Sequence, residues 1–279
     1  MSGAAGRLVG RRAVVTGASR GIGAGIVERL AAEGADVVAV ARTLEQHDHL
    51  PGSLQETVQR GSRYGTKVLA LTADLAAEDD RDGLIGRAAE MLDGPIDILV
   101  NNAAAAMYHS MADFPLKRRR LTFEVNVHAP LDLAQQALPD MIESGAGWIV
   151  NVSSATANLR QGPPFELPPP GTAMAIYGAS KAALNRLTNG LGAELYGAGV
   201  RVNTIEPRFG VLTEGAAALV GDSYSADIFE SMEEMVEGVL VLCDCAPELT
   251  GQVTVSLDLL EENSILARGL DGQIREAVR

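Results

Sequence analysis

The sequence predicts an α/β fold, in which helices cover both faces of a doubly wound parallel sheet of about seven strands. Strand and helix patterns alternate along most of the 279 residues, which is typical of parallel strands joined by crossover helices. The first of these units carries a glycine turn between its strand and its helix. With 47% hydrophobic and 21% charged residues, the chain also suits one large domain with a sizeable core.

The glycine turn lies within residues 13–30 and predicts a dinucleotide site. The β-branched run of residues 14–16 precedes Gly17, Gly21 and Gly23, and apolar residues then recur at helical spacing. Without side chains, the glycines let the backbone approach a pyrophosphate, and the helix N-terminus offers it free N–H groups. The spacing is G-x-x-x-G-x-G and not the more familiar G-x-G-x-x-G. A glycine-rich turn without a ligand is the alternative.

The remaining elements follow from apolar periodicity. Six further strands are expected at residues 36–41, 67–72, 96–100, 148–152, 200–205 and 252–257. Helices are expected at residues 54–63, 83–92, 116–142 and 177–196. A catalytic domain would span residues 8–260, with a proline-rich loop insertion at 161–171 and a C-terminal tail at 261–279. That loop either lines a substrate pocket at the carboxyl edge of the sheet or is a tolerated surface insertion.

Charge and composition exclude several classes of protein. The net charge of −13 argues against binding to nucleic acid or to an anionic membrane. The basic run at residues 117–120 is expected to be a solvated first helical turn. No signal peptide or membrane-spanning run is visible, so a cytoplasmic location is expected. Cys243 and Cys245 are expected as buried thiols, and the four histidines show no metal-ligand spacing, so no metal is predicted.

A tyrosine and a lysine four residues apart point to acid–base chemistry. Tyr177 and Lys181 share one face of a predicted helix. A nearby ammonium is expected to lower the tyrosine pKa from about 10, so that the phenol can exchange a proton with an alcohol or carbonyl oxygen. Ser154 closes the preceding strand, where its hydroxyl is placed to bond the same oxygen.

Together these motifs resemble the short-chain dehydrogenase/reductase family over residues 11–257. The matching stretches are TGASRGIG at residues 16–23, ADL at 73–75, NNA at 101–103, Asn126, NVSS at 151–154 and YGASK at 177–181. Pro207-Arg208 and the loop at residues 44–57 are similar to the hydroxysteroid-dehydrogenase-like (like-2 type) branch. The resemblance implies a Rossmann-type fold and a homo-oligomer, a dimer or a homotetramer, with its interface on the helices at residues 116–142 and 177–196.

The resemblance also implies a catalytic tetrad of Asn126, Ser154, Tyr177 and Lys181. Tyr177 would donate the proton in reduction and Ser154 would polarise the carbonyl. Lys181 would bind the nicotinamide ribose and tune Tyr177, while Asn126 would hold a water molecule in the proton relay. Asp74 would contact the adenine and Asn101 would support the adenosine side. The implied cofactor-binding residues are Gly17, Ser19, Arg20, Gly21, Ile22, Gly23, Arg42, Asp74, Leu75, Asn101, Ala103, Tyr177, Lys181 and Pro207.

The charges around the adenosine ribose favour NADP(H), with NAD(H) possible. An acidic residue at the end of the second strand would bind the ribose hydroxyls of NAD and repel a 2′-phosphate. Ala41 occupies that place, Arg42 follows it, and Arg20 lies inside the glycine turn. Two guanidinium groups suit a phosphate.

Three stretches depart from the family pattern. Ala104 replaces the glycine of NNAG, and Arg208 replaces the glycine of Pro-Gly after the sixth strand. Because that segment passes the nicotinamide in the family, Arg208 is expected to bring a charge near substrate or cofactor. The common Asp-Gly-Gly near the last strand is replaced by residues 256–259.

The predicted function is an NADP(H)-dependent oxidoreductase that interconverts a carbonyl and a secondary alcohol of a small molecule. Hydride transfer with Tyr177 as acid/base is the expected mechanism. One alternative is a 3-oxoacyl-thioester reductase, in which Arg208 and the basic run contact an acidic carrier. The other is a non-catalytic NADP(H)-binding sensor or structural protein, which would have no need of Tyr177.

Overall fold

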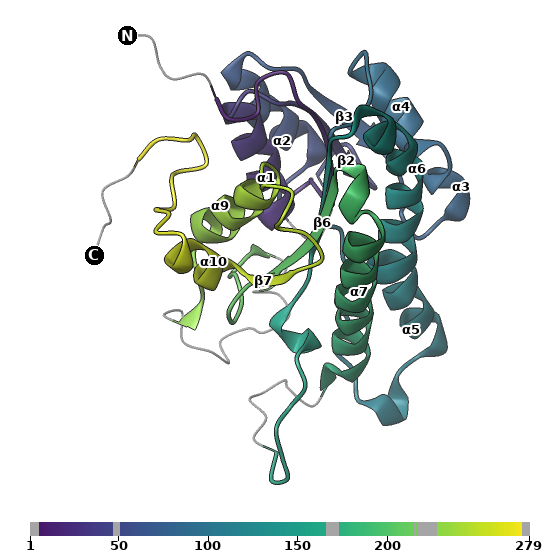
Figure 1. Cartoon of the computed structure of the whole chain (residues 1–279). Helices are drawn as coiled ribbons and strands as arrows, with labels where there is room; N and C mark the ends of the chain where they lie inside the picture. The colour runs from purple at the N-terminus through teal and green to yellow at the C-terminus, as the bar shows by residue number, and fades with distance from the viewer. Residues whose placement is uncertain (1–5, 47–50, 166–172, 215, 217–227, 275–279) are drawn as a thin grey trace.

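A seven-stranded parallel sheet forms the centre of the molecule, as the sequence predicts (Figure 1). The computed structural model describes residues 6–46, 51–165, 173–214, 216 and 228–274. The strand order is β3-β2-β1-β4-β5-β6-β7, and every neighbouring pair is parallel. The strands are β1 (Arg12–Thr16), β2 (Asp36–Ala41), β3 (Val68–Thr72), β4 (Ile98–Asn101), β5 (Gly147–Val152), β6 (Val200–Glu206) and β7 (Val253–Val255).

Helices cover both faces, which explains why the central strands are continuous apolar runs. Val14 and Val15 are both fully buried, yet they belong to different core clusters, because successive strand residues point to opposite faces. One face packs on α1 (Gly21–Ala32), α2 (Leu54–Gly61) and α9 (Met232–Leu242). The other packs on α4 (Leu84–Met91), α6 (Ala129–Ser144) and α7 (Ala175–Glu194). Figure 1 shows α9 on one side of the sheet and α6 with α7 on the other.

The shorter elements lie in the connections. A 3-10 turn, η1 (Ser62–Tyr64), follows α2, and α3 (Glu78–Arg81) precedes α4. After β4 come η2 (Met111–Asp113), α5 (Leu116–Phe123) and the π-helical turn η3 (Glu124–His128), which runs straight into α6. The helix expected at residues 116–142 is therefore present, interrupted by one π-helical turn. The 3-10 turn η4 (Ala155–Ala157) follows β5, and η6 (Tyr196–Ala198) follows α7.

Two expectations near the C-terminus are corrected. The last strand ends at Val255 and not at Leu257, because Ser256 begins the helix α10 (Ser256–Glu262). Helix α9 was not predicted, although Ser231 and Glu234 form a capping box at its start, with the Ser231 hydroxyl accepting from the Glu234 N–H at 3.1 Å. Much of the proline-rich loop lies outside the described residues.

The segment at residues 263–274 packs against α1 and α9 around a buried arginine. The side chain of Arg29 is 1% exposed and lies 2.7 Å from Glu237 and 2.9 Å from Glu33. Its Nη1 also donates to the Gly269 carbonyl at 3.4 Å. The described part of the tail expected at residues 261–279 therefore packs onto the rest of the domain. Across the described residues, no helix is long and apolar enough to span a membrane, and no metal-binding group of His, Cys, Asp and Glu forms.

Candidate active site

The turn between β1 and α1 requires glycine at several positions. Gly17 and Gly21 have φ angles of +66° and +52°, in the left-handed region that side chains disfavour. A Cβ at Gly23 would lie 2.3 Å from the Gly17 carbonyl oxygen and 2.4 Å from the Asn102 amide nitrogen. The glycines thus let the turn pack tightly on itself directly before the first turn of α1, whose N–H groups have no partner within the helix. This is the cradle that a pyrophosphate needs.

Asn102 and Thr16 hold this turn in place, and the sequence analysis did not single them out as site residues. The Asn102 amide donates to the Thr16 carbonyl at 2.9 Å and to the Gly17 carbonyl at 3.2 Å. The Thr16 hydroxyl accepts from the N–H groups of Asn102 and Ala103, both at 3.1 Å. The spacing of NNA after a predicted neighbouring strand was the available signal, since β1 and β4 are paired.

A hollow beside the turn fits the phosphate of NADP. Its volume is about 170 Å³, and it is lined by Ser19, Arg20, Arg42 and Thr43. The buried Nε of Arg20 has no hydrogen-bond partner among the described residues, while its Nη2 donates to the Gly52 carbonyl at 3.4 Å. A buried, unpaired guanidinium nitrogen is costly unless an anion completes it. The two arginines therefore lie together, as predicted, and the donor set suits a phosphate.

Other predicted cofactor residues have contacts within the protein. Asn101 is 4% exposed, and its amide donates to Asn151 Oδ1 at 2.9 Å across the β4–β5 pair. The Leu75 carbonyl accepts from Arg81 at 2.7 Å. Asp74 is exposed and accepts from the Ala76 N–H at 3.0 Å. Of these, Asp74 is exposed at the carboxyl edge, whereas the Asn101 side chain lies between strands.

Tyr177 and Lys181 lie side by side on the first turns of α7. The Lys181 ammonium is 5.9 Å from the centroid of the Tyr177 ring, and both residues are buried. Lys181 Nζ donates to the carbonyl of Val152, the last residue of β5, at 2.7 Å. This bond fixes α7 against the strand end that carries Ser154, two residues further on. Helical spacing and the β5–α7 contact thus bring three of the four predicted tetrad residues together.

Ser154 completes the contact with the phenol. It hydrogen-bonds the Tyr177 side chain. Its Oγ also accepts from the Thr156 hydroxyl at 2.9 Å and from the Thr156 N–H at 3.3 Å, which caps η4. The neighbouring Ser153 hydroxyl instead donates to Asn185 Oδ1 at 2.5 Å. Ser154 is therefore the serine whose side chain contacts the Tyr177 phenol.

Asn126 lies in the π-helical turn η3, and its side chain is buried. Its amide donates to the Ser180 hydroxyl at 3.0 Å, and that hydroxyl donates to the Tyr177 carbonyl at 2.7 Å. Its Oδ1 accepts from the Ala105 N–H at 2.7 Å. Asn126 thus joins the loop after β4 to the start of α7. Ser180, a residue inside the YGASK motif, carries this link and was not assigned a role from the sequence.

Burial moves the two ionisable groups of the site towards their neutral forms. It lowers the pKa of Lys181 to about 8. Burial raises the pKa of Tyr177, as does Tyr108, whose ring meets that of Tyr177 edge-on at 5.9 Å, and the hydrogen bond with Ser154 opposes them. The predicted lowering of the tyrosine pKa is therefore wrong for the chain by itself, because desolvation outweighs the hydrogen bond with Ser154.

Arg208 does not lie free at the mouth of the site. Its guanidinium donates to Asp258 at 2.6 and 2.9 Å and to Glu261 at 2.8 Å, both on α10. These carboxylates raise its pKa. The charge that Arg208 is expected to bring near substrate or cofactor is therefore paired with two carboxylates. Pro207, before it, is buried at the end of β6.

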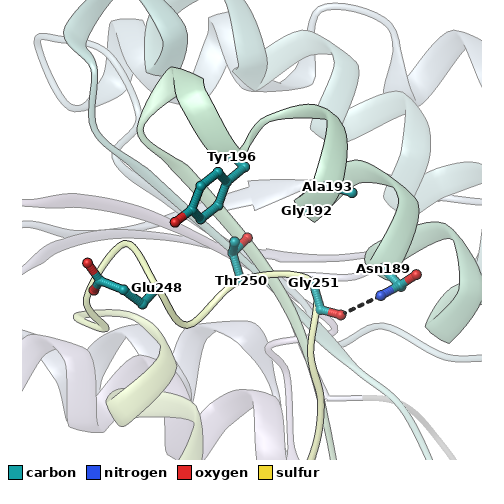
Figure 2. A pocket seen from close by; sticks show the side chains of 7 residues that line it. All are labelled: Asn189, Gly192, Ala193, Tyr196, Glu248, Thr250 and Gly251. Atoms are coloured by element: carbon teal, nitrogen blue, oxygen red, sulfur yellow. Dashed lines mark hydrogen bonds between the residues drawn. The ribbon is translucent and has the colours of Figure 1, made fainter.

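A separate hollow of about 270 Å³ lies towards the other end of α7 (Figure 2). It is lined by Asn189, Gly192, Ala193, Tyr196, Glu248, Thr250 and Gly251. Asn189 donates to the Gly251 carbonyl at 2.9 Å and joins α7 to the loop before β7. Twelve residues of helix separate Tyr177 from Asn189, about 18 Å, so this hollow is not part of the catalytic site.

Comparisons with known proteins agree with this geometry. The family model described as short chain dehydrogenase matches residues 11–221. L-xylulose reductase of Bos taurus is 33% identical over 261 residues, which is 90% of this chain and 96% of that protein. Hydroxysteroid dehydrogenase-like protein 2 of Danio rerio is 29% identical over 93% of this chain but 60% of its own length. The chain spans 64% of the ketoacyl reductase HetN of Nostoc, at 32% identity over 72% of this chain.

Solved structures give the same result. A putative NAD(P)-dependent gluconate 5-dehydrogenase from Beutenbergia cavernae, with NADP at low occupancy, superposes with a TM-score of 0.75 at 31% identity, covering 89% of this chain and 96% of that one. A 3-oxoacyl (acyl-carrier-protein) reductase from Agrobacterium tumefaciens C58 with NADP bound gives 0.74 at 29% identity, covering 89% and 93%. The chain belongs to the short-chain dehydrogenase/reductase family, oxidoreductases that act on CH–OH groups.

Proposed function

We propose that the protein is an NADP(H)-dependent reductase that interconverts a carbonyl and a secondary alcohol, with Tyr177 as the acid/base. The observation that carries the proposal is the buried contact of Tyr177 with Ser154 and Lys181 where β5 meets α7. A protein that merely binds the cofactor has no need of a buried phenol at this position. The fold by itself does not decide between the two roles.

The chain's residues divide the work of reduction among them. The nicotinamide, when bound, supplies the hydride that goes to the carbonyl carbon. The Tyr177 hydroxyl gives its proton to the carbonyl oxygen, and the resulting phenolate is reprotonated from solvent. Ser154 holds and polarises that oxygen. Lys181 stabilises the phenolate as it forms, and Asn126 keeps the π-helical turn and the loop after β4 in register with Tyr177.

Arg20 and Arg42 support a preference for NADP(H). They line the same hollow, and the unpaired Arg20 Nε offers a donor that a 2′-phosphate would satisfy. NADP is bound in several structural neighbours, including a short chain dehydrogenase from Burkholderia cenocepacia J2315 at 30% identity. By family likeness, the active form would be a cytoplasmic homo-oligomer.

The test is Tyr177→Phe, assayed by NADPH oxidation with a panel of ketones and aldehydes. The variant loses the acid but keeps the ring, so kcat is expected to fall by about 10³-fold or more, while NADPH affinity stays within about twofold. Fluorescence titration of NADPH gives the affinity. Full activity in the variant would reject Tyr177 as the acid. Tight NADPH binding without turnover by the wild-type protein would favour the binding role.

A further inference from the structure

Three loops form the rim of the active site, and each exposes large apolar side chains. They follow β4, β5 and β6, which are neighbours in the sheet, so the loops leave the same carboxyl edge side by side, in the lower part of Figure 1. The exposed fraction of these side chains ranges from 40% to 90%, and the residues are Met111, Leu159, Phe165, Phe209, Leu212 and Ile228. Apolar side chains gathered around a site indicate an apolar ligand.

The inner wall of the site is aromatic as well. Tyr108 lies on the loop after β4, and its ring meets the Tyr177 ring at 5.9 Å and an interplanar angle of 68°. The backbone on both sides of Tyr108 is anchored. The Ala105 N–H bonds Asn126 at 2.7 Å, and the His109 N–H bonds the Ala173 carbonyl at 3.2 Å. Tyr108 therefore places an aromatic ring beside the Tyr177 phenol, on one of the loops that expose apolar side chains.

The same loop leads into a cluster of positive charge. The α5 basic cluster consists of Lys117, Arg118, Arg119 and Arg120, all exposed in the first turns of α5. Cations at a helix N-terminus oppose the helix dipole, and the first turn holds no acidic residue. Among the described residues, no carboxylate lies within ion-pair distance of the cluster. Successive residues of a helix point to different sides, so these four charges surround the start of α5, and in a chain of net charge −13 this positive helix end suits an anionic ligand.

Contacts connect the α5 basic cluster to the catalytic residues. Arg118 Nη1 lies 2.6 Å from His109 Nε2, and His109 is the neighbour of Tyr108 in the chain. From Leu116 to Asn126 the backbone is helical through α5 and η3, a rise of about 15 Å. The start of α5, where an anion on the cluster would bind, thus lies about 15 Å from Asn126 along the helix axis. Arg208 cannot take this role, because Asp258 and Glu261 neutralise it.

We propose that the substrate is amphiphilic, with its reacting carbonyl on an apolar segment that the rim and Tyr108 contact. At its far end it carries an anionic group that binds the α5 basic cluster. This inference rests on the proposed function and names the substrate class of the same site. It excludes small neutral polyols as the preferred substrates, because they would contact neither surface.

A matched pair of substrates tests the anionic end. One is a 3-oxoacyl-coenzyme A with a medium-length acyl chain, and the other is the N-acetylcysteamine thioester of the same acid, which lacks the phosphates. We expect the wild-type enzyme to favour the coenzyme A ester by about tenfold or more in kcat/KM at low salt. The preference should shrink as salt screens the charges. Among the neutral thioesters, kcat/KM should rise with chain length.

Charge variants separate recognition from structural damage. Lys117→Ala and Arg118→Ala should each raise KM for the coenzyme A ester several-fold and change KM for the neutral thioester much less, and Arg118→Lys should keep the wild-type KM for the coenzyme A ester. Arg63→Ala is the matched control, because Arg63 is also exposed but lies in η1, before the amino end of β3. The Arg63→Ala substitution should change KM for neither substrate.

Two kinds of failure are distinguishable. Equal kcat/KM for the two thioesters in the wild-type enzyme, or an equal loss for both in the charge variants, overturns the anionic end. A rate that does not depend on acyl length, or that favours short polyhydroxylated ketones, overturns the apolar segment. In both cases the proposed function stands if Tyr177→Phe abolishes the observed turnover, and it fails if the variant retains it.

Discussion

Tyr177 and Lys181 are buried so deeply that both are driven towards their neutral forms. A neutral phenol is the form that gives a proton, so the site in the chain alone is prepared for reduction. A phenolate formed there is stabilised by Lys181 Nζ, which the Val152 carbonyl holds 5.9 Å from the ring. In the proposed reaction the pair would therefore act through a charge that exists briefly during turnover and not through a resting ion pair.

Arg42 offers the simplest test of the choice between NADP and NAD. Arg42→Ala removes one of the two guanidinium groups that line the hollow beside the glycine turn. We expect the NADPH:NADH ratio of kcat/KM to fall by about 10–100-fold, the range expected when one charged hydrogen-bond partner of a phosphate is lost. Steady-state assays with both cofactors measure it. A variant that keeps the wild-type ratio would show that Arg42 makes no contact with the phosphate.

Glu230 predicts a pH dependence of stability. It is 7% exposed, its Oε2 accepts from the Ser256 hydroxyl at 2.5 Å, and burial raises its pKa to about 7. Because the folded-state pKa is raised, the stability that the neutral carboxyl contributes is present below about pH 4.5 and is lost as the pH rises through about 7. Glutamine stays neutral at every pH. The unfolding free energy of Glu230→Gln should therefore increase relative to that of the wild type by about 1–3 kcal/mol as the pH rises from 5 to 8. Urea unfolding at the two pH values measures this gain, and a difference that does not change with pH would contradict it.

At the scale of elements, the turn from β1 into α1 is the least tolerant of substitution. Gly23→Ala would place a Cβ 2.3 Å from the Gly17 carbonyl oxygen, so the turn must shift. We expect NADPH affinity to fall at least tenfold, together with a loss of stability of about 1–3 kcal/mol. Gly86→Ala is the control, because Gly86 lies inside α4 with open space around it, and there alanine should add about 0.5–1 kcal/mol. Calorimetry measures the stability of both variants and the NADPH affinity of Gly23→Ala. An NADPH affinity equal to that of the wild type in Gly23→Ala would contradict the steric argument.

The sequence predicts the strands well because each is a buried apolar run between polar ends. The strand at residues 36–41 has the same bounds in the structure, and the other central strands differ by one or two residues. The edge is harder: β7 has three residues, and its continuation was mistaken for strand because Ser256 and Leu257 fit an apolar alternation equally well. A local sequence pattern cannot show that α10 begins at Ser256, nor that its carboxylates pair with Arg208.

Motif spacing identifies the candidate catalytic residues, but it does not predict their contacts. Spacing places Tyr177 and Lys181 on one helical face, and the structure confirms that they are neighbours. The direction of the tyrosine pKa was mistaken because spacing carries no information on burial. Tyr108 was missed because sixty-nine positions separate it from Tyr177, and only the loop fold brings the two rings together.

The whole molecule is held together by a buried ion network that joins distant segments. Arg29 on α1 contacts Glu33 on the same helix, Glu237 on α9 and the carbonyl of Gly269 near the C-terminus. Glu237→Ala would leave the Arg29 guanidinium partly unpaired at 1% exposure. The expected loss is about 3–5 kcal/mol of unfolding free energy.

A matched exposed ion pair serves as the control for that prediction. Arg7 and Asp244 lie 3.5 Å apart, and each side chain is 38% exposed. Asp244→Ala should cost much less than Glu237→Ala, because water screens and replaces the lost contact. Equilibrium urea unfolding compares the two. Similar losses in both variants would show that burial of the Arg29 network adds nothing to stability.

The salt bridges between Arg208 and α10 affect how the two segments respond to substitution. Arg208 stands where relatives carry glycine, and Asp258 and Glu261 stand on a helix that replaces their glycine pair. Each departure balances the other, so exchanging one side leaves either a guanidinium without its acceptors or two carboxylates without a cation. Because all three side chains are exposed and water screens their charges, a single exchange should change the stability little, and a paired exchange would leave no charge without its partner.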